Sequence, residues 1–120
     1  MKNSKSTEDY LEAILLLSRE SEYVHRVDVA RRLGVSQPAV QKAVKILQSD
    51  GYVECEGLHI YLTGKGYGYA ENIYDRHCTL KTFLLSLGVN ELDAEADACE
   101  MEHVLSPATY EAIKSVVKNK

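Results

Sequence analysis

A short turn between two helical patterns is the strongest constraint on how this chain can fold. The first pattern runs from Arg26 to Gly34, and a glycine commonly follows the last turn of a helix because it tolerates a left-handed backbone. Ser36 is a suitable N-cap, and Pro38 falls in the first turn of a second pattern that continues to Gln48. The sequence therefore predicts two helices joined by a short turn.

The segment after these helices has the pattern of a β-hairpin. Asp50-Gly51 closes the second helix, and residues 52–62 read as two short strands around Glu56-Gly57. A helix-turn-helix followed by a hairpin is the arrangement of a winged helix. We therefore expect a mainly α protein whose N-terminal part is a winged helix-turn-helix.

The second helix of the pair has an apolar face and a polar face of one chemical kind. Its apolar positions recur at helical spacing and predict burial. Its outward positions carry amides and amines but no acids, namely Gln37, Gln41, Lys42 and Lys45. Such side chains suit the major groove of DNA, where they meet base edges and phosphates.

The distribution of charge supports this interpretation, although the net charge of −4 at pH 7 argues weakly against a nucleic-acid partner. Residues 23–49 hold five basic side chains and one acidic side chain. Residues 67–120 hold five basic and nine acidic side chains. A basic N-terminal part followed by an acidic C-terminal part favours two modules with different partners.

A second group of candidate residues lies in the acidic part. At helical spacing, Glu95, Cys99, Glu102 and His103 fall on one arc of a helix. Carboxylate, thiol and imidazole are the side-chain types that bind divalent transition metals. The alternative is a helix with a half-buried cysteine and surface glutamate and histidine residues, and the sequence leaves both interpretations open.

Two other predicted helices carry side chains of the same kinds. In the first helix, Asp9 and Glu12 lie on a stripe that otherwise looks buried, although near an exposed N-terminus they could instead favour the helix dipole. His77 lies within a long helix that Thr63 caps and Gly88 ends. Taken alone, a histidine in such a place is most often a core or surface residue.

Length and composition describe an ordinary globular protein. The 120 residues suffice for one domain, or for two small domains that share a core. No stretch has the length of a signal peptide core or a membrane span, so we expect a cytoplasmic protein with no membrane partner. Three cysteines without C-x-x-C spacing predict neither a disulfide framework nor a zinc ribbon.

Taken together, the motifs resemble the family of the diphtheria toxin repressor and the manganese transport regulator. The resemblance rests on the winged helix, T-E-D-Y-L-E-A-I near the N-terminus, D-R-H at 75–77 and C-E-M-E-H-V-L-S at 99–106, and it covers nearly the whole chain. It implies a homodimeric repressor that binds a pseudo-palindromic operator with Fe(II) or Mn(II) as corepressor. The SH3-like domain of longer members is expected to be absent.

The resemblance also implies a metal site drawn from three helices. Its ligands would be Asp9, Glu12, His77, Cys99, Glu102 and His103. Cys99 matches the iron branch of the family and Asp9 the manganese branch, so the expected site is a hybrid. Lys81 and Glu95 stand where the iron branch has an ancillary glutamate and histidine, and these departures argue against an ancillary second metal.

The resemblance places Ser36 and Pro38 at the operator, with Lys42 contacting bases or backbone. The predicted DNA-binding set is then Ser36, Gln37, Pro38, Ala39, Gln41, Lys42 and Lys45. We expect a winged-helix domain over residues 1–63 and a helical metal-binding and dimerisation domain over 64–120. The expected function is that of a metal-dependent transcriptional repressor, not of an enzyme.

Two other function classes stay open at this point. A winged-helix regulator could instead sense a redox change through Cys55, Cys78 or Cys99. A small metal-dependent hydrolase would use similar ligands, but it would need a general base and a substrate cleft. The sequence has no Gly-rich phosphate loop, nucleophile elbow or H-E-x-x-H motif, which disfavours the hydrolase.

Overall fold

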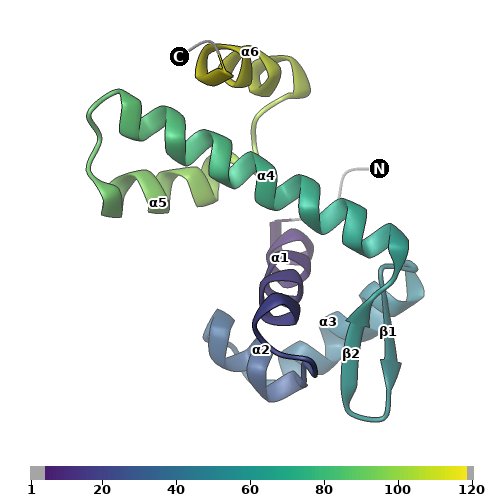
Figure 1. Cartoon of the computed structure of the whole chain (residues 1–120). Helices are drawn as coiled ribbons and strands as arrows, with labels where there is room; N and C mark the ends of the chain where they lie inside the picture. Colours follow the sequence, from purple (N-terminus) through teal and green to yellow (C-terminus); the bar gives the residue numbers. More distant parts are fainter. Residues whose placement is uncertain (1–4, 119–120) are drawn as a thin grey trace. The chain divides into compact units, whose positions relative to one another are not determined.

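The computed structural model describes residues 5–118 of the chain (Figure 1). Within these residues there are six helices and one two-stranded sheet, which confirms the predicted mainly α class. In chain order the elements are α1 (Lys5–Glu20), α2 (Arg26–Leu33), α3 (Gln37–Ser49), β1 (Val53–Glu56), β2 (His59–Leu62), α4 (Gly64–Ser86), α5 (Glu91–Met101) and α6 (Pro107–Lys118). None of the helices in this range is both long and apolar enough to cross a membrane.

The chain divides into two compact units within α4. The N-terminal unit extends to Glu71, and the C-terminal unit begins at Asn72. The first part of α4 thus belongs to the winged helix, and the rest belongs to the C-terminal helices. The domain boundary expected after residue 63 stays a prediction.

Local sequence signals explain the predicted pair of helices in the N-terminal unit. α2 ends at Gly34, which has a φ of 67°, and the Gly34 N–H donates to the carbonyl of Ala30. Ser36 caps α3, because its hydroxyl accepts a hydrogen bond of 3.2 Å from the N–H of Ala39. The predicted turn and the start of the second helix are therefore confirmed.

The hairpin forms as expected, with its turn one residue later than predicted. β1 and β2 are antiparallel, and Glu56 still pairs with His59, so the turn consists of Gly57 and Leu58. Gly57 has a φ of 61°, a conformation that glycine adopts without strain. The N–H of Ile60 also donates to the carbonyl of Val24 at 2.8 Å, which ties the hairpin to the segment before α2.

Apolar side chains from α1, α2, α3 and the hairpin form most of the core of the N-terminal unit. α1 packs against both α2 and α3, and α3 packs against β1. The fully buried side chains come from positions that the helical and alternating patterns place inward. They are Leu11, Ile14, Leu15, Val24, Val29, Val40, Val44, Leu47, Val53 and Ile60.

The C-terminal unit has a smaller core. Leu80 of α4, Ala98 of α5 and Tyr110 of α6 are buried against one another, with partly buried side chains around them. Two polar contacts add to this packing. The Tyr110 hydroxyl donates to Thr79 Oγ1 at 3.3 Å, and Arg76 donates to the carbonyl of Leu105 at 3.0 Å.

The start of α4 packs closely against the backbone of the hairpin. Thr63 Oγ1 accepts a hydrogen bond of 3.1 Å from the N–H of Gly66, and the Thr63 N–H donates to the carbonyl of Tyr52 at 3.0 Å. A Cβ atom at Gly66 would overlap that Tyr52 carbonyl. Position 66 therefore requires glycine for the close approach of the helix to the wing.

We expect Gly66→Ala to lower the free energy of unfolding by about 1–3 kcal/mol, because the added methyl must push backbone apart. Gly68→Ala in the same helix is the matched control, since its Cβ meets no atom within 4 Å. That change should raise the free energy of unfolding by about 0.5–1 kcal/mol. Urea unfolding of both variants measures the difference, and equal effects would contradict the close approach.

Candidate metal centre and DNA-binding surface

Three of the predicted metal ligands lie together in the C-terminal unit. His77 is on α4, whereas Glu102 and His103 are in the turn that follows α5. Glu102 Oε2 lies 3.5 Å from His77 Nδ1, and Glu102 Oε1 lies 3.3 Å from His103 Nε2. All three side chains are buried, and Glu102 is only 2% exposed. The structure thus places one buried carboxylate between two imidazoles.

The end of α5 corrects one expectation. The arc was predicted on a helix that continues through His103, but α5 ends at Met101 and Glu102 is its C-cap. The next two N–H groups donate to carbonyls three residues earlier, His103 to Glu100 at 3.3 Å and Val104 to Met101 at 3.1 Å. The tighter turn leaves Cys99 in the last turn of the helix, half-buried, and the two later residues outside it.

Glu102 dominates the electrostatics of this cluster. Its carboxylate raises the pKa of His77 to about 9, while burial acts in the opposite direction and Glu95 adds to the increase. In the metal-free protein at neutral pH, His77 is therefore an imidazolium that compensates the buried carboxylate. A metal ion would bind only the deprotonated nitrogen, so it would have to displace this proton.

The donor set fits a divalent transition metal. Imidazole nitrogen and carboxylate oxygen are ligands for Fe(II), Mn(II) and Zn(II). His77 Nδ1 is buried and makes no well-formed hydrogen bond, although it lies 3.5 Å from Glu102 Oε2. A proton or a metal cation next to this nitrogen is what makes burial of the neighbouring carboxylate tolerable. His77, Glu102 and His103 are the residues that would hold the ion.

The other predicted ligands lie on separate elements. Cys99 is on α5 in the C-terminal unit, whereas Asp9 and Glu12 are on α1 in the N-terminal unit. All three are half-buried, and Asp9 forms an ion pair of 3.1 Å with Lys5. Their role as ligands stays a prediction.

Glu95 is a functional candidate that the predicted ligand set left out. Its Oε1 lies 3.0 Å from His77 Nε2, and its Oε2 lies 3.1 Å from Lys81 Nζ. Burial acts to raise the pKa of Glu95, but the ammonium of Lys81 and the His77 ring lower it below its usual value. The signal in the sequence was the position of Glu95 on the same helical arc as Cys99 and Glu102.

The cysteines carry no disulfide. Cys55 is on β1, Cys78 on α4 and Cys99 on α5, and all three are half-buried thiols. A redox-sensing regulator would need one of these thiols to react, and reactive thiols are also partly exposed, so their burial does not decide against this alternative.

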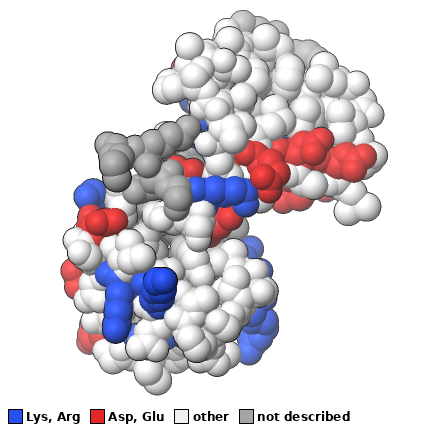
Figure 2. All heavy atoms as spheres, turned by 180° about the vertical axis from the view of Figure 1, so that it is seen from behind, with Lys and Arg blue, Asp and Glu red and all other residues white. Residues whose placement is uncertain are grey.

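The predicted DNA-binding residues lie on the surface of the N-terminal unit. Among them only Ala39 is partly buried, while the other predicted residues are exposed: Ser36, Gln37, Pro38, Gln41, Lys42 and Lys45. Figure 2 shows lysine and arginine side chains on the N-terminal unit and a row of acidic side chains on the C-terminal unit. This arrangement agrees with the opposite charges counted in the two parts of the sequence.

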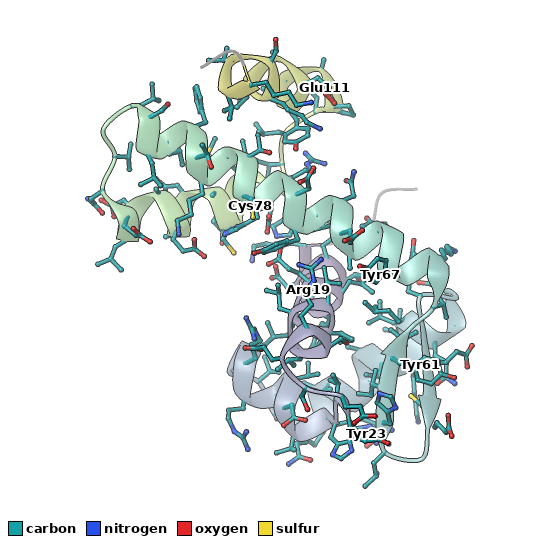
Figure 3. The ribbon with its side chains drawn as sticks, viewed as in Figure 1. Arg19, Tyr23, Tyr61, Tyr67, Cys78 and Glu111 are labelled. Carbon is teal, nitrogen blue, oxygen red and sulfur yellow. The ribbon has the colours of Figure 1, made fainter. Side chains whose placement is uncertain are left out.

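Aromatic side chains of the wing and of the segment before α2 also lie on the surface of this unit. Tyr23 and Tyr61 flank His59, with ring centroids 5.1 Å and 5.4 Å from the His59 ring (Figure 3). Tyr23 is 57% exposed and Tyr61 is 38% exposed. This exposed group of rings was not part of the predicted DNA-binding set.

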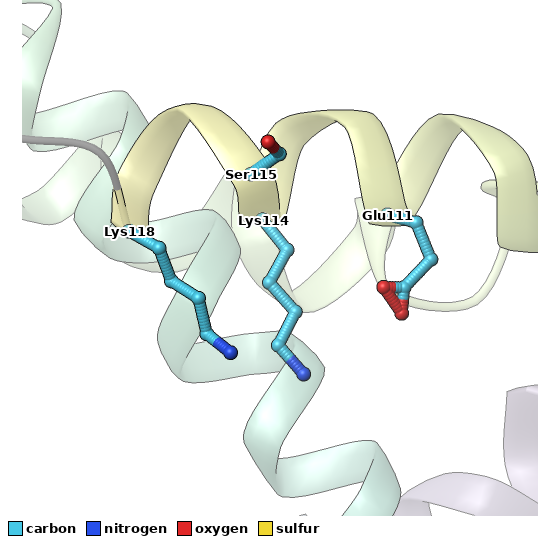
Figure 4. Close-up of a pocket in the computed structure, with 4 residues that line it drawn as sticks. All are labelled: Glu111, Lys114, Ser115 and Lys118. Atoms are coloured by element: carbon cyan, nitrogen blue, oxygen red, sulfur yellow. The ribbon is translucent and has the colours of Figure 1, made fainter.

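An open hollow on the C-terminal unit is separate from the candidate metal ligands. Glu111, Lys114, Ser115 and Lys118 line it, and all four side chains come from α6 (Figure 4). The hollow contains neither an imidazole nor a thiol among its lining residues. It therefore lacks the imidazole donors found at His77 and His103.

Comparison with known families assigns the chain to one of them. Residues 2–59 match the iron dependent repressor N-terminal DNA binding domain, and residues 63–119 match the iron dependent repressor metal binding and dimerisation domain. The chain belongs to the iron-dependent repressor family. The resemblance inferred from the sequence is confirmed, and so is the function class, that of metal-responsive transcriptional regulators.

Individual relatives agree with this assignment. The transcriptional regulator MntR of Escherichia coli O6:H1 is 41% identical over 108 residues, which cover 89% of this chain and 70% of the relative. The metal-dependent transcriptional regulator MtsR superimposes with a TM-score of 0.87 at 27% identity, over 93% of this chain and 53% of that one. A manganese-dependent transcriptional repressor in complex with manganese gives 0.84 at 28% identity, over 93% and 52%. The chain thus spans about half the length of these solved structures.

The raised pKa of His77 leads to a prediction for the metal-free protein. The pKa of His77 rises from 6.5 to about 9 on folding. Its protonation should therefore stabilise the folded state fully below pH 6.5, and this stabilisation should be lost as the pH rises through about 9. Urea unfolding in the presence of a chelator and a thiol reductant, at several pH values across this window, measures the effect.

His77→Gln is the reference variant, because its side chain does not titrate. The difference in unfolding free energy between wild type and His77→Gln should shrink as pH approaches 9. A difference that stays constant with pH would show that the imidazolium does not compensate Glu102.

Proposed function

We propose that this protein is a cytoplasmic repressor that binds operator DNA as a homodimer when Fe(II) or Mn(II) is bound at His77, Glu102 and His103. The observation that carries the proposal is the presence, in one chain, of an exposed polar recognition helix and a buried imidazole–carboxylate–imidazole cluster. The family assignment and the manganese-dependent repressor of similar structure support it.

The proposed ligand set also includes Asp9 and Glu12 of α1 and Cys99 of α5. A bound divalent ion would supply the positive charge that lets several carboxylates share one site. α1 packs against α2 and α3 in the N-terminal unit. Ligands on α1 would therefore connect metal occupancy to the position of the recognition helix α3.

The expected coupling is thermodynamic and reciprocal. Metal binding would favour one arrangement of the two recognition helices in a dimer, and DNA would favour the same arrangement. A homodimer presents two equal DNA-binding surfaces, so its operator is expected to be pseudo-palindromic. The proposed contacts are made by Ser36, Gln37, Pro38, Ala39, Gln41, Lys42 and Lys45.

The proposal predicts that metal tightens specific DNA binding by about 5–150-fold, the usual range for coupling between two sites. A duplex selected from a random DNA pool in the presence of Mn(II) is the probe. Its dissociation constant is measured anaerobically with Fe(II), with Mn(II) and with a chelator. Equal affinity of the chelated and metal-loaded protein for this duplex would contradict the corepressor function.

Two lysine variants control this experiment. Lys42→Ala should weaken binding of the duplex without changing Mn(II) affinity, and if Lys42 contacts phosphate alone the salt slope should fall by about one. Lys118→Ala removes an exposed lysine from α6 in the other unit. It should leave DNA binding unchanged.

Cys99 is expected to set the preference between the two metals. Thiolate is a softer ligand than carboxylate and favours Fe(II) over Mn(II). Fe(II) should therefore activate DNA binding ahead of Mn(II) at equal concentration, and Cys99→Glu should shift this preference toward Mn(II). Half-maximal activating concentrations of the two ions, measured anaerobically for both proteins, give the ratio.

Cys99→Ala tests whether the thiol is a ligand at all. Loss of a ligand should raise the half-maximal concentration of both ions. An unchanged concentration would instead identify Cys99 as a small apolar residue of the helix and remove it from the ligand set.

A further inference from the structure

The two nitrogens of the His77 ring face different partners. Nδ1 lies 3.5 Å from Glu102 Oε2, and Nε2 lies 3.0 Å from Glu95 Oε1. Glu95 belongs to α5, so its contact with His77 joins α4 to α5. The side of the ring that faces away from Glu102 is thus held by a second carboxylate.

Lys81 holds this second carboxylate in turn. Its Nζ lies 3.1 Å from Glu95 Oε2 and 3.2 Å from Glu91 Oε1. His77 and Lys81 are one helical turn apart on α4, and Glu91 and Glu95 are one turn apart on α5, so all four side chains meet across the same pair of helices. Each oxygen of Glu95 therefore has its own partner.

The exposure of Glu95 and Lys81 limits how much their ion pairs can stabilise the fold. The Glu95 side chain is 52% exposed, and the Lys81 side chain is 27% exposed. Solvent screens such ion pairs, so their contribution to stability is small. A weak ion pair can still orient the Glu95 carboxylate, because orientation requires a preferred geometry and not a large contribution to stability.

We propose that Glu95 and Lys81 are positioning residues that select the metal-binding nitrogen of His77. This inference rests on the proposed function. Lys81 fixes Glu95, Glu95 accepts a hydrogen bond from Nε2–H, and the lone pair for an ion is then on Nδ1, the nitrogen that faces Glu102. An oriented carboxylate behind a histidine ligand fixes its tautomer and its ring orientation.

The chain of contacts from Lys81 through Glu95 to His77, called the relay below, holds the imidazole in one orientation, with Nδ1 toward Glu102. Without Glu95, the imidazole could rotate about its Cβ–Cγ bond or carry its proton on the other nitrogen, and only part of the population would present a lone pair toward Glu102. Lys81 also supplies the cation for Glu91 and Glu95. Both acids are thereby engaged within the protein, and Glu95 is the one that contacts the His77 ring.

Mn(II) affinity of the full chain, measured by calorimetry, tests the relay. Glu95→Ala should weaken binding by about 10–100-fold, the usual effect of removing the partner of a ligand. Glu95→Gln should cost less, because its neutral oxygen still accepts a hydrogen bond. Lys81→Met should weaken binding, and Lys81→Arg should restore it by keeping a cation beside Glu95.

Glu91→Ala is the matched control. It removes an acid from the same helix, one turn away, that contacts Lys81 but has no ion pair with His77. Its Mn(II) affinity should equal that of the wild type. If Glu91→Ala and Glu95→Ala weakened Mn(II) binding equally, the removal of a negative charge near the site would explain the effect, and the relay would be overturned.

A double-mutant cycle with His77→Ala separates the relay from the metal site itself. In the His77→Ala background, Glu95→Ala should cause no further loss, since Glu95 acts only through the ring. Additive losses would overturn the relay. If His77→Ala leaves Mn(II) affinity unchanged, the proposed metal site is wrong. If His77→Ala weakens Mn(II) binding but Glu95→Ala does not, the metal site stands and only the relay is rejected.

Nitrogen NMR gives a readout that does not depend on affinity. In the protein loaded with diamagnetic Zn(II), long-range proton–nitrogen spectra should show His77 with a protonated Nε2 and a metal-bound Nδ1. Glu95→Ala should give a second ring state or a broadened signal. A Zn(II)-bound Nε2 in the wild type would overturn the assignment.

Discussion

Burial of the Glu102 carboxylate is the constraint on which the C-terminal unit depends. A carboxylate that is 2% exposed needs a compensating positive charge or several hydrogen-bond donors, because desolvation strongly disfavours its ionised form. Two of the groups beside it are the imidazoles of His77 and His103. In the metal-free chain the protonated His77 provides this charge, and the same position suits a divalent cation.

The two units are stabilised in different ways, and the difference bears on how a metal could act. The N-terminal unit has many fully buried aliphatic side chains, and Ser36 caps α3, so apolar burial and local hydrogen bonds stabilise its winged helix. The core of the C-terminal unit is small, and polar contacts from Arg76, His77 and Tyr110 add to it. A bound ion would therefore change how existing helices are arranged more than whether they form.

Lys81 and Glu95 have a structural role that the sequence alone did not reveal. In the sequence they look like two lost ligands of an ancillary site. In the structure they are an ion pair of 3.1 Å whose carboxylate also contacts His77. The positive charge beside these acids is the ammonium group of Lys81, and Glu95 also contacts His77, a residue of the proposed metal centre.

The sequence by itself determined the features that depend on neighbouring residues. Ser36, Gly34 and Thr63 act through short hydrogen bonds or local dihedral angles, so the turn, helix α3 and the start of α4 could be predicted. Tertiary structure decided the rest. The partnership of His77 with both Glu95 and Glu102, and the overlap that requires glycine at position 66, join residues far apart in the chain. The end of α5 depended on the tight turn before α6, because helical periodicity predicts which residues share a face but not where packing ends the helix.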